Sequence, residues 1–243
     1  MTLALIDERI SPDARAALED GGFHTLTVPA CMGLPEATRS HPDMLLFPLG
    51  DNIFTEEGYL AENKDFFAEL CAAAPRLKIT PITESLSSEY PRDCVLNVLS
   101  VGDRLFLKSD SVSRTVLDEI NRQGIRTVSV KQGYPACTVL ALGDAHAITA
   151  DRGMARALLA DGVEVLKISD GGILLPPYDY GFIGGAAGVY GDKIYFIGDY
   201  LTHPDGENIR AFAEAAGYTA VSLDAGQLRD LGRIIFIDTD KQN

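Results

Sequence analysis

The feature that most constrains this sequence is a helix-to-strand unit that recurs five times. Each copy begins as a capped or amphipathic helix, ends at a glycine or proline, and continues into a short β-branched strand. The helices begin near Ser11, Thr55, Val112, Asp151 and His203, stop near Gly21, Pro75, Gly124, Gly162 and Gly217, and lead into strands at 24–28, 77–80, 126–130, 164–168 and 218–222. Such self-similarity predicts a fold built from repeated supersecondary units.

A hairpin signal precedes each of the four later helices. Two short apolar strands flank a Gly-Asp pair there, and the pairs are Gly50-Asp51, Gly102-Asp103, Gly143-Asp144 and Gly191-Asp192. The first helix has no such hairpin. However, a lone strand at 3–6 precedes it, and another at 233–237 has no helix after it. Pairing these two strands completes the first unit and closes a ring, which removes exposed strand edges.

We therefore expect an α/β fold with one domain over residues 1–243. It is a five-bladed, pseudo-symmetric α/β propeller of ββαβ units, closed by pairing of the N- and C-terminal strands. An open doubly wound sheet is the alternative, because strands and helices alternate there too. The hairpins count against that alternative, as does the absence of a phosphate-binding glycine motif such as GxGxxG.

The ring topology predicts which polar residues meet. The connections between units and the helix N-termini share one face, and the Gly-Asp turns lie on the other. The connections carry Cys31, His41, Asp43, Asp93, Cys94, Asn97, residues 131–137, Asp170, residues 178–180, Asp224, Gln227, Arg229 and Asp230. A thiol, an imidazole and several carboxylates around one axial depression favour nucleophilic chemistry.

The glycine-rich segment 182–188 is predicted to be a strand near the axis. Its small residues either leave room for a ligand or allow close packing of the inner strands.

The composition limits the classes of molecule that this protein is expected to bind. With 35 acidic and 21 basic residues, the formal charge of −14 opposes binding to nucleic acid and suits cationic or neutral small molecules, although solubility alone would also explain it. The N-terminal residues lack a signal-peptide pattern, and no apolar run is long enough to span a membrane. The four scattered cysteines fit a reducing cytoplasm. No motif calls for a metal or a cofactor, and a homo-oligomer is compatible with the sequence.

Three segments carry a resemblance to a known family: 131–134 (KQGY) with Cys137, 181–185 (GFIGG) and 231–235 (LGRII). With the five-fold unit, they resemble a bacterial branch of the pentein fold, the superfamily of guanidino-group-modifying enzymes, which also includes a ribosome anti-association factor. The resemblance implies a cysteine thiolate that attacks a guanidinium carbon, a histidine that shuttles protons, and carboxylates that hold the cation. In that family the cysteine stands at the start of the closing strand, where this sequence has Asp230-Leu-Gly-Arg233 and no cysteine.

Our first hypothesis is a cysteine-dependent hydrolase or transferase that acts on a cationic guanidino or amidine compound in the axial depression. Cys137 is the candidate nucleophile, because it occupies an equivalent position in another blade, and His41 and Asp43 are the other candidate catalytic residues. A nearby cation, Lys131 or protonated His41, could lower the pKa of the thiol. The candidate substrate-binding residues are Asp93, Asn97, Lys131, Gln132, Tyr134, Asp179, Gly184, Gly185 and Asp230.

Each of these residues also has a structural interpretation. Cys137 could be a small buried hydrophobe, His41 could hydrogen-bond its own connection, and Lys131 and Tyr134 could order the turn around Gly133. The acidic residues could be helix caps or solvated loop charges. The second hypothesis is therefore a pentein-fold module that binds a small molecule or a protein without turnover, and the missing C-terminal cysteine favours it.

Overall fold

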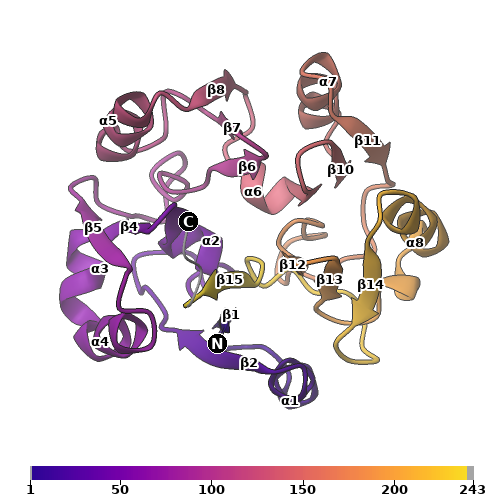
Figure 1. The fold of residues 1–243 in the computed structure, drawn as a ribbon, viewed down its shortest axis with the longest axis horizontal. Helices are drawn as coiled ribbons and strands as arrows, with labels where there is room; N and C mark the ends of the chain where they lie inside the picture. The colour runs from indigo at the N-terminus through magenta and orange to yellow at the C-terminus, as the bar shows by residue number, and fades with distance from the viewer. Residues whose placement is uncertain (1, 240–243) are drawn as a thin grey trace.

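A computed structural model describes residues 2–239, and its strands form five three-stranded sheets around a central axis (Figure 1). Blade 1 contains β15 (Ile235–Asp238), β1 (Thr2–Asp7), α1 (Pro12–Asp20) and β2 (Phe23–Val28). Blade 2 contains α2 (Pro42–Leu45), β3 (Phe47–Leu49), β4 (Asn52–Glu56), α3 (Glu57–Glu62), α4 (Lys64–Ala73) and β5 (Lys78–Ile82). Blade 3 contains β6 (Leu99–Val101), β7 (Arg104–Leu107), α5 (Arg114–Gln123) and β8 (Arg126–Ser129).

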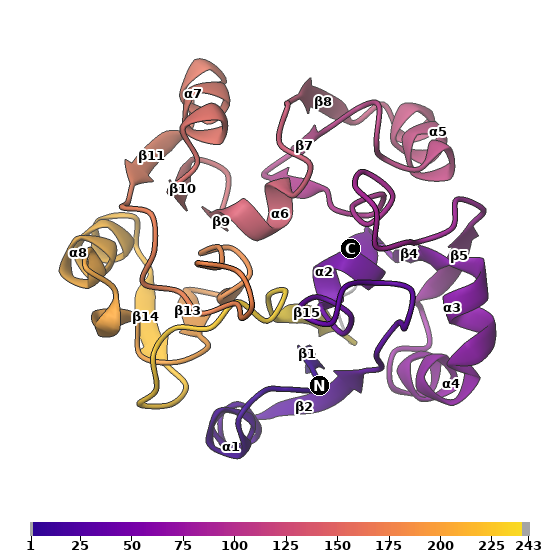
Figure 2. The same ribbon diagram turned by 180° about the vertical axis from the view of Figure 1, so that it is seen from behind.

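Blade 4 contains α6 (Pro135–Thr138), β9 (Val139–Leu142), β10 (His146–Thr149), α7 (Arg152–Ala160) and β11 (Glu164–Lys167). Blade 5 contains β12 (Ala187–Tyr190), β13 (Lys193–Phe196), the 3₁₀ helix η1 (Tyr200–Thr202), α8 (Gly206–Ala215) and β14 (Thr219–Ser222). In every blade the first strand is antiparallel to the middle strand, and the middle strand is parallel to the last. The long helices lie on the outside of the ring (Figures 1 and 2).

The two ends of the described chain meet in blade 1, as the repeat predicted. Strand β1 pairs antiparallel with β15, with Leu3 opposite Ile237 and Leu5 opposite Ile235. Because β1 also pairs with β2, the first and last strands of the chain share one sheet. The prediction of a closed five-bladed ring of ββαβ units is confirmed.

Local sequence signals explain most element boundaries. Ser11 accepts a hydrogen bond from Ala14 N at the start of α1, and Asp151 caps α7 in the same way. The four Gly-Asp turns each have a glycine with positive φ, near 60°, a conformation that L-residues with a Cβ adopt only at a cost. The helix expected from 55 to 75 is two helices, α3 and α4, that meet at Asn63.

The apolar core lies between neighbouring blades rather than inside each one. Phe54 of blade 2 packs with Leu105 of blade 3, and Phe106 of blade 3 packs with Met154 of blade 4. Blades 4 and 5 share a further cluster, and blade 1 packs against both blade 5 and blade 2. Because each apolar cluster combines residues from more than one blade, we expect the blades to fold together cooperatively. Within residues 2–239 no helix combines the length and apolarity that crossing a membrane requires.

Candidate functional site

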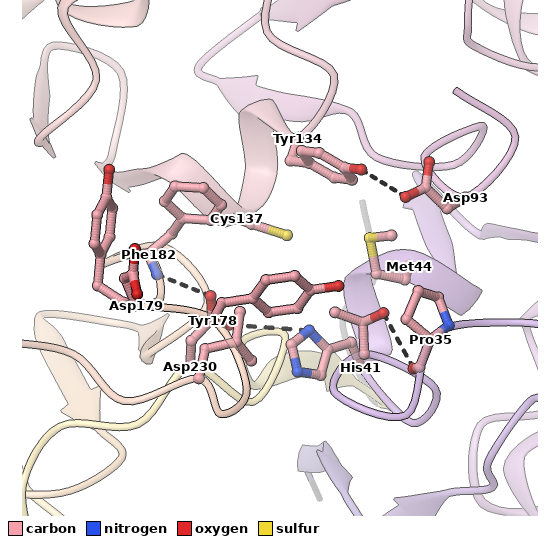
Figure 3. A pocket seen from close by; sticks show the side chains of 13 residues that line it. Pro35, His41, Met44, Asp93, Tyr134, Cys137, Tyr178, Asp179, Phe182 and Asp230 are labelled. Carbon is pink, nitrogen blue, oxygen red and sulfur yellow. Dashed lines mark hydrogen bonds and ion pairs between the residues drawn. The ribbon is translucent and has the colours of Figure 1, made fainter. Parts of the chain in front are cut away.

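A cavity of about 380 Å³ opens where the connections between blades converge (Figure 3). We call it the front pocket. Its walls combine one thiol, one imidazole and three carboxylates with aromatic and apolar side chains. The lining residues are Pro35, Thr38, His41, Met44, Asp93, Tyr134, Cys137, Leu175, Tyr178, Asp179, Tyr180, Phe182 and Asp230. Six of them were candidates from the sequence: His41, Asp93, Tyr134, Cys137, Asp179 and Asp230.

Cys137 lies in the single helical turn α6, not in a strand as the sequence pattern suggested. Pro135 occupies the first turn, where a missing N–H costs nothing, and β9 begins only at Val139. Asn97 fixes this turn, because its Oδ1 accepts from Ala136 N at 2.8 Å and its Nδ2 donates to Cys137 Sγ at 3.1 Å. Asn97 thus positions the thiol and does not line the front pocket.

Asp43 is the second partner of the thiol. The Cys137 thiol donates to Asp43 Oδ2 at 3.0 Å, and both residues are buried. Burial raises the pKa of Cys137 well above its ordinary value, and the charges of Asp43 and Asp230 raise it further. Burial also raises the pKa of Asp43 to about 6, although the thiol hydrogen bond and the charge of Arg233 act in the opposite direction. The resting site therefore holds a protonated thiol.

His41 precedes the helical turn α2, and its imidazole is 1 % exposed. Burial lowers its pKa to about 3, so the ring is neutral at neutral pH. Neither ring nitrogen has a hydrogen-bond partner within residues 2–239, and Nδ1 lies 3.9 Å from Asp230 Oδ1 (Figure 3). A neutral imidazole with two free nitrogens can accept or relay a proton. It cannot lower the pKa of Cys137, as a protonated His41 was expected to do.

Asp230 is held by one backbone N–H from another connection and by one from its own connection. Phe182 N donates to Oδ2 at 2.8 Å, and Gly232 N donates to Oδ1 at 3.1 Å. Burial raises its pKa to about 7, and the nearby charge of Asp43 raises it further, whereas the two N–H groups lower it. Asp230 is thus poised to change protonation state near neutral pH.

Gly184 and Gly185 shape the site without lining the front pocket. A Cβ on Gly185 would lie 1.9 Å from Asp230 Oδ1, and one on Gly184 would lie 2.4 Å from the carbonyl oxygens of Ala136 and Val139. These glycines make room for the carboxylate and for α6. The segment 182–188 was expected to be one strand, but residues 183–186 form a turn and β12 begins at Ala187.

Asp93 and Tyr134 form the opposite wall, where the Tyr134 hydroxyl donates to Asp93 Oδ2 at 2.5 Å (Figure 3). Asp93 Oδ1 is buried and has no hydrogen-bond partner within the described residues. This carboxylate oxygen is an unused acceptor behind the wall that Asp93 and Tyr134 form. It is the kind of acceptor that a buried N–H donor of a ligand would satisfy.

Lys131 and Gln132, like Asp43, Asn97, Gly184 and Gly185, do not line the front pocket. Lys131 is exposed and lines a different hollow beside α7, so it is not the cation that the thiol hypothesis required. Gln132 orders the turn before α6, because its Oε1 accepts from Tyr134 N and its Nε2 donates to Asp151. Sequence reasoning missed four lining residues, Pro35, Thr38, Met44 and Leu175. Their only signal was their place on the connections.

The sequence model of the family described as "Family of unknown function (DUF6873)" matches residues 5–235. The chain belongs to the DUF6873 family. No protein of curated function matches this DUF6873 sequence. Within residues 2–239 no group of three or more His, Cys, Asp or Glu side chains is arranged to hold a metal ion.

Several solved structures are similar to this DUF6873 member over almost its whole length. A mutant of DDAH from Pseudomonas aeruginosa complexed with citrulline has a TM-score of 0.57 at 10% identity, over 91% of each chain. The amidinotransferase SxtG from Microseira wollei also has a TM-score of 0.57 at 10% identity, over 99% of this chain and 94% of its own. The N-terminal domain of the cyanobacterial arginine dihydrolase ArgZ has a TM-score of 0.52 at 12% identity, over 91% of both. These likenesses establish the pentein fold for the chain.

Proposed function

We propose that this protein is a cysteine-dependent hydrolase or transferase acting on the C–N bond of a cationic guanidino or amidine compound. One observation carries the proposal: Cys137 shares the front pocket with the carboxylates of Asp93, Asp179 and Asp230, and no Lys or Arg within residues 2–239 lines it. Such a pocket attracts a cation. The similar structures, which include an amidinotransferase and an arginine dihydrolase, support this class of substrate.

A bound cation would supply the activation that the resting site lacks. A positive charge beside Cys137 lowers the pKa of the thiol, so the proton passes from Sγ to Asp43 Oδ2, 3.0 Å away. The thiolate then attacks the guanidinium carbon and forms a C–S bond. The leaving nitrogen takes a proton from the protonated form of Asp230, which its pKa of about 7 keeps populated at neutral pH, as the C–N bond breaks. Neutral His41 accepts a proton from the water or amine that attacks the S-linked intermediate.

The same lining predicts which cations fit. Tyr134, Tyr178 and Tyr180 present aromatic faces and edges suited to a delocalised cation. The exposed carboxylate of Asp179 stands at the mouth, where it would meet the far end of a ligand. A carboxylate on the ligand would find no basic partner there and would be repelled by Asp179. We therefore expect a substrate without a carboxylate, such as agmatine, rather than arginine.

A second candidate function is binding of the same cationic ligand without turnover. The raised pKa of Cys137 favours it, because the thiol is not activated in the resting site. The segment 230–233 before the closing strand also has no cysteine, and a Cβ on Gly232 would lie 2.2 Å from His41 Cβ.

Thermal shift and turnover assays on the Cys137→Ala variant test the proposal. We expect agmatine and benzamidine to raise the melting temperature of the wild type by several degrees, and arginine to raise it less. Cys137→Ala should keep that binding and lose turnover of any substrate at least 1,000-fold. Cys71→Ala, on α4 outside the front pocket, is the matched control and should behave as wild type.

The outcomes separate the two candidates. Binding without turnover by the wild type would establish the non-catalytic module. Full turnover by Cys137→Ala would exclude the cysteine mechanism, and the absence of any shift with cationic ligands would exclude the proposed substrate class.

A further inference from the structure

A second hollow, of about 210 Å³, lies behind Asp43 and is lined by residues from all five blades. We call it the rear pocket. Its lining residues are Asp43, Leu46, Phe47, Pro48, Leu96, Val98, Ser100, Ala136, Val189, Arg233, Ile234, Ile235 and Phe236. Asp43 separates it from the front pocket, because Asp43 lines the rear pocket and binds the thiol that lines the front one.

Arg233 is the one basic residue in this lining, and its guanidinium Nε has no hydrogen-bond partner within residues 2–239. This Nε is buried, and no acidic group of residues 2–239 forms an ion pair with the guanidinium. Even Asp43, whose pKa it lowers through space, is not within salt-bridge distance. A partly buried guanidinium with unused donors is costly, and an anion in the adjoining hollow would satisfy it.

The backbone of Arg233 adds a second, independent observation. Its φ is 60°, and among residues 2–239 it is the one residue other than glycine with a positive φ. Its N–H donates to Gly185 O at 2.8 Å, which holds that conformation. Glycine would adopt it with less strain, and residues held in such conformations cluster at active sites and ligand sites.

The walls around the guanidinium define the ligand. Apart from Asp43, Arg233 and Ser100, the lining is apolar, with Leu46, Phe47, Val98 and Ile234 among the walls. The planar fork of an arginine matches a carboxylate in a bidentate arrangement. We propose that the rear pocket binds a small monocarboxylate with an apolar body, with the carboxylate on Arg233 and the body against the apolar walls.

The test titrates benzoate and butyrate, at constant ionic strength held with sodium chloride, into wild type and two Arg233 variants. Calorimetry and thermal shift should detect binding to the wild type. Arg233→Gly relieves the backbone strain and removes the guanidinium, so it should stay folded and bind benzoate at least 10-fold more weakly. Arg233→Lys keeps the charge without the fork and should fall between. Benzyl alcohol, the neutral counterpart, should bind the wild type weakly.

A front-pocket control locates the site. Asp179→Asn changes the mouth of the other pocket and should bind benzoate as the wild type does. The proposal is overturned if the wild type binds neither carboxylate, if Arg233→Gly binds benzoate undiminished, or if Asp179→Asn rather than Arg233→Gly weakens binding. None of these readouts requires turnover or an intact Cys137, so the result is independent of the proposed function.

Discussion

At the scale of single residues, the decisive feature is a carboxyl group buried between two pockets. Asp43 is 3 % exposed, its Oδ2 accepts from the Cys137 thiol, and its Oδ1 has no partner within residues 2–239. Its pKa of about 6 lies above the ordinary value of 3.8. The folded protein therefore holds a proton there more tightly than the unfolded chain, and the resulting stabilisation is lost as pH rises through about 6.

This shift predicts the behaviour of Asp43→Asn. The variant cannot ionise at this position, so its stability relative to wild type should improve by about 2–3 kcal/mol between pH 4 and pH 7. Urea unfolding at single pH steps measures the difference. Asp192→Asn, on an exposed hairpin tip, is the control and should track the wild type. A constant difference between Asp43→Asn and wild type across this range would contradict the raised pKa.

The pKa of His41 is shifted in the opposite direction to that of Asp43. Its pKa is lowered to about 3. The neutral imidazole therefore contributes stability above pH 6.5, its ordinary pKa, and that contribution is lost as the pH falls from 6.5 toward 3.

The sequence could place His41 and Cys137 on one face, because the ring topology brings the connections together. It could not show that burial would leave the imidazole neutral and the thiol protonated, since burial depends on neighbours from other blades.

At the scale of elements, the site rests on two single-turn helices that sequence periodicity could not reveal. Helices α2 and α6 span four residues each and begin with Pro42 and Pro135. The helical period of apolar residues can be recognised in a sequence only over about three turns, so the sequence pattern predicts loop or strand for both segments. The long helices and Gly-Asp hairpins, by contrast, carry caps and turn residues that are local, and the sequence predicted them.

The contact of α6 with the turn before β12 predicts the effect of Gly184→Ala. The added methyl group would overlap the carbonyl oxygens of Ala136, Cys137 and Val139, so α6 must shift. We expect a loss of about 1–3 kcal/mol in the free energy of unfolding and weaker ligand binding in the front pocket.

Gly153→Ala is the matched control for that substitution. This glycine lies in the first turn of α7, where a Cβ would approach only the capping carboxylate of Asp151. Chemical denaturation and thermal shift measure both variants. Equal stability of Gly184→Ala and wild type would show that the turn can move aside.

At the scale of the whole molecule, closure depends on β1 and β15, whose Thr2 and Asp238 are paired neighbours. The two ends can thus be joined by a short Gly-Ser linker and the chain opened elsewhere. A circular permutant that opens between Gly191 and Asp192, at an exposed hairpin tip, should keep a single unfolding transition within a few degrees of wild type.

The comparison permutant opens between Thr138 and Val139, where α6 meets β9. It should lose ligand binding in the front pocket, because Cys137 is no longer held by a continuous turn. Circular dichroism melts and thermal shift with agmatine distinguish the two permutants. If the Gly191 permutant failed to fold, the ring would not be the cooperative unit that its shared clusters indicate.

The order in which blades contribute to the front pocket also matters while the protein is being made. A ribosome releases His41, Asp93 and Cys137 long before Asp230, and the strand that locks blade 1 emerges later still. Until the ring closes, Asp93 and Asp230 are not brought together, so they cannot jointly contact one ligand. We therefore expect a nascent chain not to bind the cations proposed as ligands, and any cleavage that separates Asp230 from the rest should abolish that binding along with the fold.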